Sequence, residues 1–232
     1  MPKRPLSNKV VTLNDQLARQ SGVRNLEKRF LIVCEDEKSA PDYFRALKKH
    51  FKLSAASIEV VGSGSHSQPI QVVEQAIEIK NRAKGRHSGT LPFEEVWCVI
   101  DGDYGAKIHN ARAKAKANHI ELAISTKCFE YWVLLHFEEI DTSTNDCNSL
   151  VHSLNRELEK KSFPRYQKGN CDFRTIVLNV LNACERAERL RKPGLARNEL
   201  PENQNPCTEI YRLINAILTQ EDKEVGKSTR NK

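Results

Sequence analysis

The sequence predicts an α/β fold with a parallel-sheet core, flanking helices and a helical C-terminal half. Two patterns carry this prediction. In the first half of the chain, four short apolar runs alternate with segments of helical periodicity, which is typical of a parallel sheet with helices on both faces. After Ser125 the apolar residues recur at helical spacing only. A hydrophobic content of 39% over 232 residues is enough for one core.

The predicted strands are short apolar runs that end at charged or turn-forming residues, as buried parallel strands do. They lie at residues 29–34, 57–61, 96–100 and 120–124. One helix is expected to begin near Pro41, with Ser39 as its cap, and another near Pro69, because proline suits the first turn of a helix. An Ala- and Lys-rich helix is expected over residues 105–118.

The sequence of the second half of the chain predicts only helices. Apolar spacing places them at residues 129–136, 150–158, 173–190 and 206–218. Asp146 and Asp172 have the position of helix caps. Residues 191–204 contain two prolines and little apolar content, which predicts a loop. On one of these helices, His136 is expected to be buried and hydrogen-bonded within the core rather than to move protons.

Four regions follow from this reading. Residues 1–27 hold five Lys and Arg residues without sustained periodicity, and they predict a flexible basic N-terminal arm. Residues 28–127 are expected to form the α/β core. Residues 128–220 should form a helical region packed on or beside that core, and residues 221–232 a disordered tail.

Composition bounds the function and the compartment. The chain has 37 Lys and Arg against 30 Asp and Glu, a net charge of +7, which suits a nucleic-acid partner although many other proteins are equally basic. No apolar run approaches the roughly 18 to 20 residues that a membrane span needs. The N-terminus lacks the apolar stretch of a secretory signal, so the cytoplasm is expected.

The seven cysteines form no Cys-x-x-Cys pair, and their spacing fits no common zinc module. Because the cytoplasm keeps thiols reduced, they are expected to be free and structural.

Acidic residues follow two of the predicted strands. Glu35 closes the first, and Asp101 and Asp103 close the third, separated by Gly102. In open parallel sheets, ligands bind outside the carboxyl ends of the strands. On an extended chain two carboxylates at this spacing point the same way.

Three carboxylates so placed repel one another unless a cation joins them. The pattern therefore predicts a Mg²⁺ or Mn²⁺ site with Glu35, Asp101 and Asp103 as ligands. Such an ion polarises a phosphate and lowers the pKa of an attacking water. The alternative is that Asp-Gly-Asp is ordinary turn chemistry.

Four segments resemble the RloB-like family. They read CEDEKS at 34–39, followed by Tyr43 and Phe44, VWCVIDGD at 96–103, CFEYWVLLHF at 128–137 and NPCT at 205–208. The resemblance implies a TOPRIM-like fold related to nucleases of the OLD type, and an association with restriction and phage-defence genes. It also implies that Glu35, Asp101 and Asp103 hold Mg²⁺.

The first motif departs from the family pattern, which usually reads Glu-Gly-x-x-Thr-Glu. Asp36, Ser39 and Ala40 replace the glycine, the threonine and the second glutamate, and Tyr104 stands where a third acidic residue often follows. Three consequences stay open: one ion binds instead of two, Asp36 and Glu37 compensate, or the site is degenerate.

Glu130 is the fourth candidate for a catalytic residue. It begins a predicted helix just after the fourth strand, from which it could reach the same metal ion. A glutamate in the first turn of a helix is also favoured by the helix dipole, which needs no catalytic role.

Three functions compete. The first is a Mg²⁺-dependent nuclease acting on DNA or RNA in a prokaryotic anti-phage or restriction-associated system. The second is a non-catalytic subunit of a defence complex, which binds nucleic acid or a partner protein such as an ATPase. The third is a phosphatase of the haloacid-dehalogenase type with Asp101 as nucleophile, Asp103 as general acid and Ser125 in its second motif. Tyr104 and the helical second half disagree with that last alternative.

Overall fold

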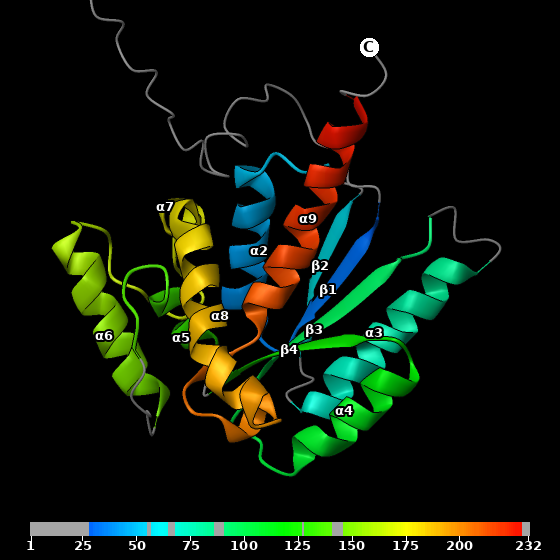
Figure 1. The fold of residues 1–232 in the computed structure, drawn as a ribbon, viewed down its shortest axis with the longest axis horizontal. Coiled ribbons are helices and arrows are strands. Elements are labelled where there is room, and N and C mark those ends of the chain that lie inside the picture. The colour runs from blue at the N-terminus through cyan, green and yellow to red at the C-terminus, as the bar shows by residue number, and fades with distance from the viewer. Residues whose placement is uncertain are drawn as a thin grey trace, which may run out of the picture.

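The computed structural model describes residues 28–54, 57–64, 68–85, 91–126, 128–140 and 146–228. The predicted basic arm, residues 1–27, lies outside these ranges. Within them the chain forms a five-stranded sheet with helices on both faces, so the predicted α/β class is confirmed (Figure 1).

The sheet has the order β2-β1-β3-β4-β5. The strands β1 to β4 run parallel, and their register pairs Phe30 with both Ile58 and Glu95, and Trp97 with Glu121. The bounds are β1 (Phe30–Cys34), β2 (Ile58–Gly62), β3 (Glu95–Asp101), β4 (Glu121–Thr126) and β5 (Cys207–Thr208).

The helices of the α/β half connect these parallel strands, as the alternating pattern predicted. They are α2 (Ser39–His50), α3 (Pro69–Lys84) and α4 (Lys107–Ala117). The second half adds α5 (Phe129–Leu134), α6 (Cys147–Lys160), α7 (Phe173–Ile176), the 3₁₀ turn η1 (Val177–Asn179), α8 (Val180–Ala196), the 3₁₀ turn η2 (Pro201–Asn203) and α9 (Ile210–Ser228).

Two apolar layers hold the sheet between helices. Side chains alternate across a strand, so β1 sends Leu31 and Val33 to the face covered by α3 and α4. Phe30 and Ile32 point to the other face and belong to one continuous apolar cluster with Trp132. α2 and helices of the second half lie on that side of the sheet (Figure 1). The helical half therefore covers a face of the sheet and shares its core.

The second half differs from the sequence prediction in its breaks. The helix expected over residues 173–190 is interrupted by η1, and α8 runs on to Ala196 through part of the predicted loop. Pro193 lies inside α8, where its ring removes a helical hydrogen bond. Side chains support this turn: Gln204 donates to the carbonyl of Leu190 (2.6 Å), and Arg191 donates to that of Glu199 (2.6 Å).

The C-terminal region also carries a strand that the sequence analysis missed. The two residues of β5 pair antiparallel with Ser125 and Thr126, and α9 starts only at Ile210 rather than at residue 206. At its other end α9 continues to Ser228, beyond the point where a disordered tail was expected. None of the described helices is long and apolar enough to cross a membrane.

The cysteine prediction is wrong for one pair. Cys128 and Cys147 form a disulfide that joins the residue before α5 to the first residue of α6, with their Cα atoms 6.1 Å apart. That separation lies within the range that a disulfide spans. Cys34, Cys98, Cys171, Cys184 and Cys207 are free.

Both predicted caps are confirmed. The Asp146 carboxylate accepts from the N–H of Ser149 (2.8 Å) at the start of α6, and that of Asp172 accepts from the N–H of Arg174 (3.1 Å) at the start of α7.

Candidate functional site

A small cavity opens at the carboxyl ends of β1 and β3, beside the start of α5. Its volume of about 10 Å³ is room for a single water-sized group. Its lining residues come from both halves of the chain: Glu35, Asp36, Ser39, Ala40, Val99, Asp101, Phe129, Glu130 and Lys168. Three of the four predicted site residues, Glu35, Asp101 and Glu130, are thus brought together.

Glu35 is joined directly to the end of β3. Its Oε2 accepts from the backbone N–H of Asp101 (3.0 Å), and its Oε1 accepts a short hydrogen bond from the Tyr104 hydroxyl. Burial raises the pKa of the Glu35 carboxyl, the two hydrogen bonds oppose this, and the charges of Asp103 and Asp36 raise the pKa further. The carboxylate is therefore held in place in an environment that disfavours its charge.

Asp101 is the last residue of β3 and links the sheet to the helical half. Its Oδ1 accepts from the backbone N–H of Phe129 (3.0 Å), the first residue of α5. Burial raises the pKa of the Asp101 carboxyl well above its usual range, and the charges of Glu35 and Glu130 add to this effect. Lys168 partly offsets it.

Asp103 lies elsewhere. The strand ends at Asp101, so the extended geometry that would align the two aspartates stops there, and Asp103 sits exposed in the following turn. It does not line the cavity, although its charge raises the pKa of Glu35. Close packing explains the glycine at position 102, because a Cβ there would lie 2.6 Å from Oγ1 of Thr126 on β4.

Asp36 supports the start of α2 from two positions before the N-cap residue, Lys38. Its carboxylate accepts from the backbone N–H groups of Ser39 (2.6 Å) and Ala40 (3.1 Å). The prediction of Ser39 as the cap is therefore wrong: Ser39 is the first residue of the helix. An aspartate close to a predicted helix start is a common acceptor for the free N–H groups there, and this signal could have revealed the role of Asp36.

Glu130 lies in the first turn of α5 with only 3% of its surface exposed. The Tyr166 hydroxyl lies 2.6 Å from its Oε1 and 3.0 Å from the Ser39 hydroxyl. Tyr166 comes from residues 161–172, the connection between α6 and α7. This connection thereby ties the start of α2 to the start of α5.

Lys168 lies on the same connection and reaches the cavity, where its charge lowers the pKa of Asp36 and Asp101 against the larger effect of burial. Sequence reasoning found neither Tyr166 nor Lys168, because nothing in their local sequence separates them from ordinary loop residues.

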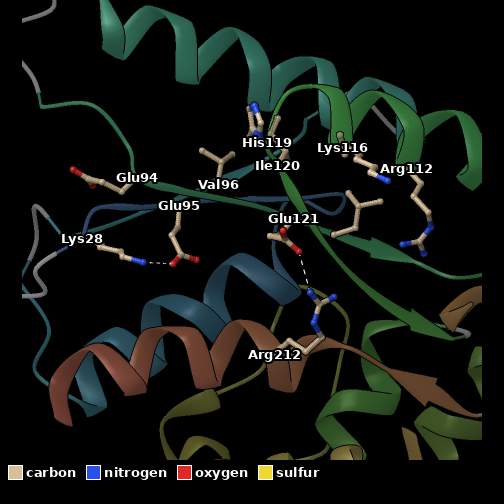
Figure 2. Close-up of a pocket in the computed structure, with 12 residues that line it drawn as sticks. Lys28, Glu94, Glu95, Val96, Arg112, Lys116, His119, Ile120, Glu121 and Arg212 are labelled. Carbon is tan, nitrogen blue, oxygen red and sulfur yellow. Dashed lines mark hydrogen bonds and ion pairs between the residues drawn. The ribbon is translucent and has the colours of Figure 1, made fainter. Parts of the chain in front are cut away.

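A second, much larger hollow of about 620 Å³ lies at the opposite end of the sheet, at the starts of β3 and β4 (Figure 2). Its charges are largely matched. Lys28 pairs with Glu95 (2.9 Å), and Arg212 of α9 pairs with Glu121 (2.9 Å), as the dashed lines in Figure 2 show. Arg112 reaches Glu202 of η2 (2.5 Å).

His136 lies away from the acidic cavity in the core, as predicted. Its Nε2 is 3.0 Å from the Tyr43 hydroxyl, and its Nδ1 is 3.1 Å from the carbonyl of Trp132. Burial lowers the pKa of His136 to about 4, so the ring is neutral near pH 7.

The cavity fits a hard divalent cation in the kind of its donors, since carboxylate oxygens are the ligands that Mg²⁺ and Mn²⁺ take. Burial of several carboxylates with one nearby ammonium leaves negative charge that a cation would neutralise. In the described part of the chain, no three His, Cys, Asp or Glu side chains lie close enough to hold a metal ion.

Fold and site together define a class: an α/β protein with a mainly parallel sheet and a buried acidic cavity at the carboxyl ends of its strands. The model of the RloB-like protein family matches residues 30–217, and the chain belongs to that family. No curated protein and no solved structure matches the chain significantly.

Proposed function

We propose that this protein is a Mg²⁺- or Mn²⁺-dependent nuclease that hydrolyses phosphodiester bonds of DNA or RNA in a prokaryotic anti-phage or restriction-associated system. One observation carries the proposal. Glu35, Asp36, Asp101 and Glu130, which come from three separate parts of the sequence, line one cavity at the carboxyl ends of the strands, where α/β proteins bind ligands. When bound, a divalent ion would supply Lewis-acid activation of the phosphate.

Glu35 and Asp101 are the proposed principal ligands. Both are fixed by backbone N–H donors, from Asp101 and Phe129 respectively, and each keeps further lone pairs that could face an ion. Asp103, in the exposed turn, would join only if that turn moved toward the cavity. Ion binding would remove the electrostatic cost that raises the pKa of Glu35 and Asp101.

Glu130 is proposed to act beside these ligands, either on the ion or on the attacking water. The Tyr166 hydroxyl fixes one of its oxygens and leaves the other available. Because α5 starts at Phe129, whose N–H holds Asp101, one short helix orients two of the four proposed catalytic carboxylates.

The test is cleavage of labelled single- and double-stranded DNA and RNA by the purified protein with Mg²⁺ or Mn²⁺. We expect cleavage that EDTA abolishes and that Asp101→Asn reduces about 100-fold or more, since the substitution removes a ligand charge from the cavity. Absence of cleavage across substrates and ions, or equal cleavage by Asp101→Asn, would contradict the proposal.

A second candidate is a non-catalytic subunit of a defence complex that binds nucleic acid or a partner protein such as an ATPase. The contacts of Glu35 favour it, since both of its oxygens already accept hydrogen bonds, one of them from Tyr104. It predicts binding that survives Glu35→Gln, with no cleavage by the wild-type protein.

A further inference from the structure

The connection between α6 and α7, residues 161–172, contributes Lys168 to the lining of the acidic cavity and is held in place by hydrogen bonds. The backbone N–H of Tyr166 donates to Oδ1 of Asn155 on α6 (2.7 Å), and that of Gly169 donates to the Ser39 hydroxyl (3.3 Å). Together with the Tyr166 hydroxyl, these bonds hold the connection at both the helical half and the start of α2.

Gly169 brings this connection into direct contact with Lys38, the residue before α2. Its backbone has φ +76°, which favours glycine, and a Cβ there would lie 2.7 Å from Cδ of Lys38. The stem of Lys38 therefore lies against the residue that follows Lys168. Two lysines that are 130 residues apart in the chain thus belong to segments that touch each other, and one of them, Lys168, lines the cavity.

Both lysines are exposed, and neither has an ion-pair partner among the residues that the structure describes. This sets them apart from Lys28 and Arg212 of the large hollow, which are each paired with a glutamate. Lys168 lines the cavity itself. An acidic cavity alone would repel a polyanion, so a substrate phosphate needs compensating positive charge at its mouth.

We propose that Lys38 and Lys168 form an anion clamp that binds the phosphodiester backbone of a nucleic acid at the mouth of the acidic cavity. The inference rests on the proposed function for its substrate class and adds the residues that would hold the substrate. A lysine ammonium is a point charge with three donors, which suits phosphate oxygens without reading the bases. The clamp therefore binds without sequence preference.

The experiment measures binding apart from cleavage. Fluorescein-labelled DNA and RNA oligonucleotides, single- and double-stranded, are titrated with protein in EDTA over a range of salt concentrations, and anisotropy gives Kd. Each phosphate contact contributes about 0.7 to the salt slope for single strands and about 0.9 for B-DNA. We expect Lys168→Gln and Lys38→Gln each to lower the slope by about that amount and to weaken binding about three- to tenfold.

Lys116→Gln is the matched control, because Lys116 is an exposed lysine that lines the large hollow at the far end of the sheet. It should leave both slope and Kd unchanged, and unchanged thermal unfolding of all three variants shows that they fold. Equal losses in all three, or unchanged slopes for Lys38→Gln and Lys168→Gln, would overturn the clamp.

The two proposals fail separately. Binding that follows this pattern in a protein that never cleaves would keep the clamp and reject the nuclease. Cleavage that falls in Lys168→Gln while the salt slope stays at the wild-type value would reject the clamp and keep the nuclease. Absence of any nucleic-acid binding by the wild-type protein would reject the clamp.

Discussion

The two ends of the sheet differ in size and in electrostatics. The hollow at the amino ends of β3 and β4 is about 620 Å³, and three of its cations, Lys28, Arg112 and Arg212, are paired with glutamates (Figure 2). The cavity at the carboxyl end holds only about 10 Å³, yet four carboxylates line it with one ammonium. Burial raises the pKa of three of them, Glu35, Asp36 and Asp101.

This difference shows that the larger of the two pockets is not the better candidate for the reactive site. Charges that are already compensated have little interaction energy left for a ligand, whereas buried like charges gain from any cation that joins them. The strands place the carboxylates at the end where each strand gives way to a loop. The paired end fastens α9 to the sheet, and we assign the reaction to the other end.

The largest difference in cleavage rate should appear between two variants that each lose one carboxylate, one at each end of the sheet. Glu35→Gln keeps one acceptor oxygen for the Asp101 N–H, and its amide NH2 can donate to the Tyr104 hydroxyl, but it loses the negative charge, so we expect cleavage to fall about 100-fold or more. Glu95→Gln, at the other end, should leave the cleavage rate at the wild-type value. Single-turnover rates on one labelled substrate decide, and similar losses in both variants would erase the distinction between the ends.

A smaller effect concerns the neutral core histidine. The folded-state pKa of His136, about 4, lies below its usual value near 6.5, so its contribution to stability is present above pH 6.5 and is lost as the pH falls toward 4. At pH 5 the loss is about 2 kcal/mol. We expect the free energy of unfolding of His136→Gln to decline less over this range.

His152 is the matched control for that measurement, because it is exposed on α6. Urea unfolding at pH 7 and pH 5 should give His152→Gln the wild-type difference. A His136→Gln variant that loses as much stability as the wild type between these pH values would show that this ring does not titrate on unfolding.

The smallest effect should come from the ion pair that closes the large hollow. Arg212 and Glu121 are 39% and 55% exposed, and such pairs contribute about 1 kcal/mol or less. Glu121→Gln should therefore shift the urea midpoint only slightly and leave cleavage unchanged. If Glu121→Gln lowered the free energy of unfolding by several kcal/mol, the ion pair would be a major contributor to stability, which contradicts this expectation.

Much of the α/β half could be predicted from the sequence because its strands are short apolar runs with abrupt polar ends. The same rule placed Glu35 and Asp101 at one edge of the sheet. Asp103 was harder, since the assumed extended geometry ends at Asp101. The strand β5 has only two residues, which is too few for an alternating pattern to show in the sequence. Its residue Thr208 pairs with Ser125, which is 83 residues earlier in the chain.

The residues missed at the site share a physical cause. Tyr166 and Lys168 lie in a connection without periodicity, and their role comes from contacts with Ser39, Glu130 and the cavity that only the fold creates. The helical course through Pro193 has the same origin, because distant side chains such as Gln204 stabilise it. Local pattern predicts elements, whereas these features depend on tertiary contacts.

The central claim is that the carboxyl-end cavity binds a divalent ion. The most direct test is a titration of the purified protein with Mn²⁺, in which electron paramagnetic resonance measures the concentration of the free ion. We predict saturable binding that is lost in Asp101→Asn and kept in Glu95→Gln, because the carboxyl-end cavity gathers four carboxylates around one ammonium, whereas Glu95 of the large hollow is paired with Lys28. Wild-type protein that leaves Mn²⁺ free, or Asp101→Asn that binds it with wild-type affinity, would contradict the account.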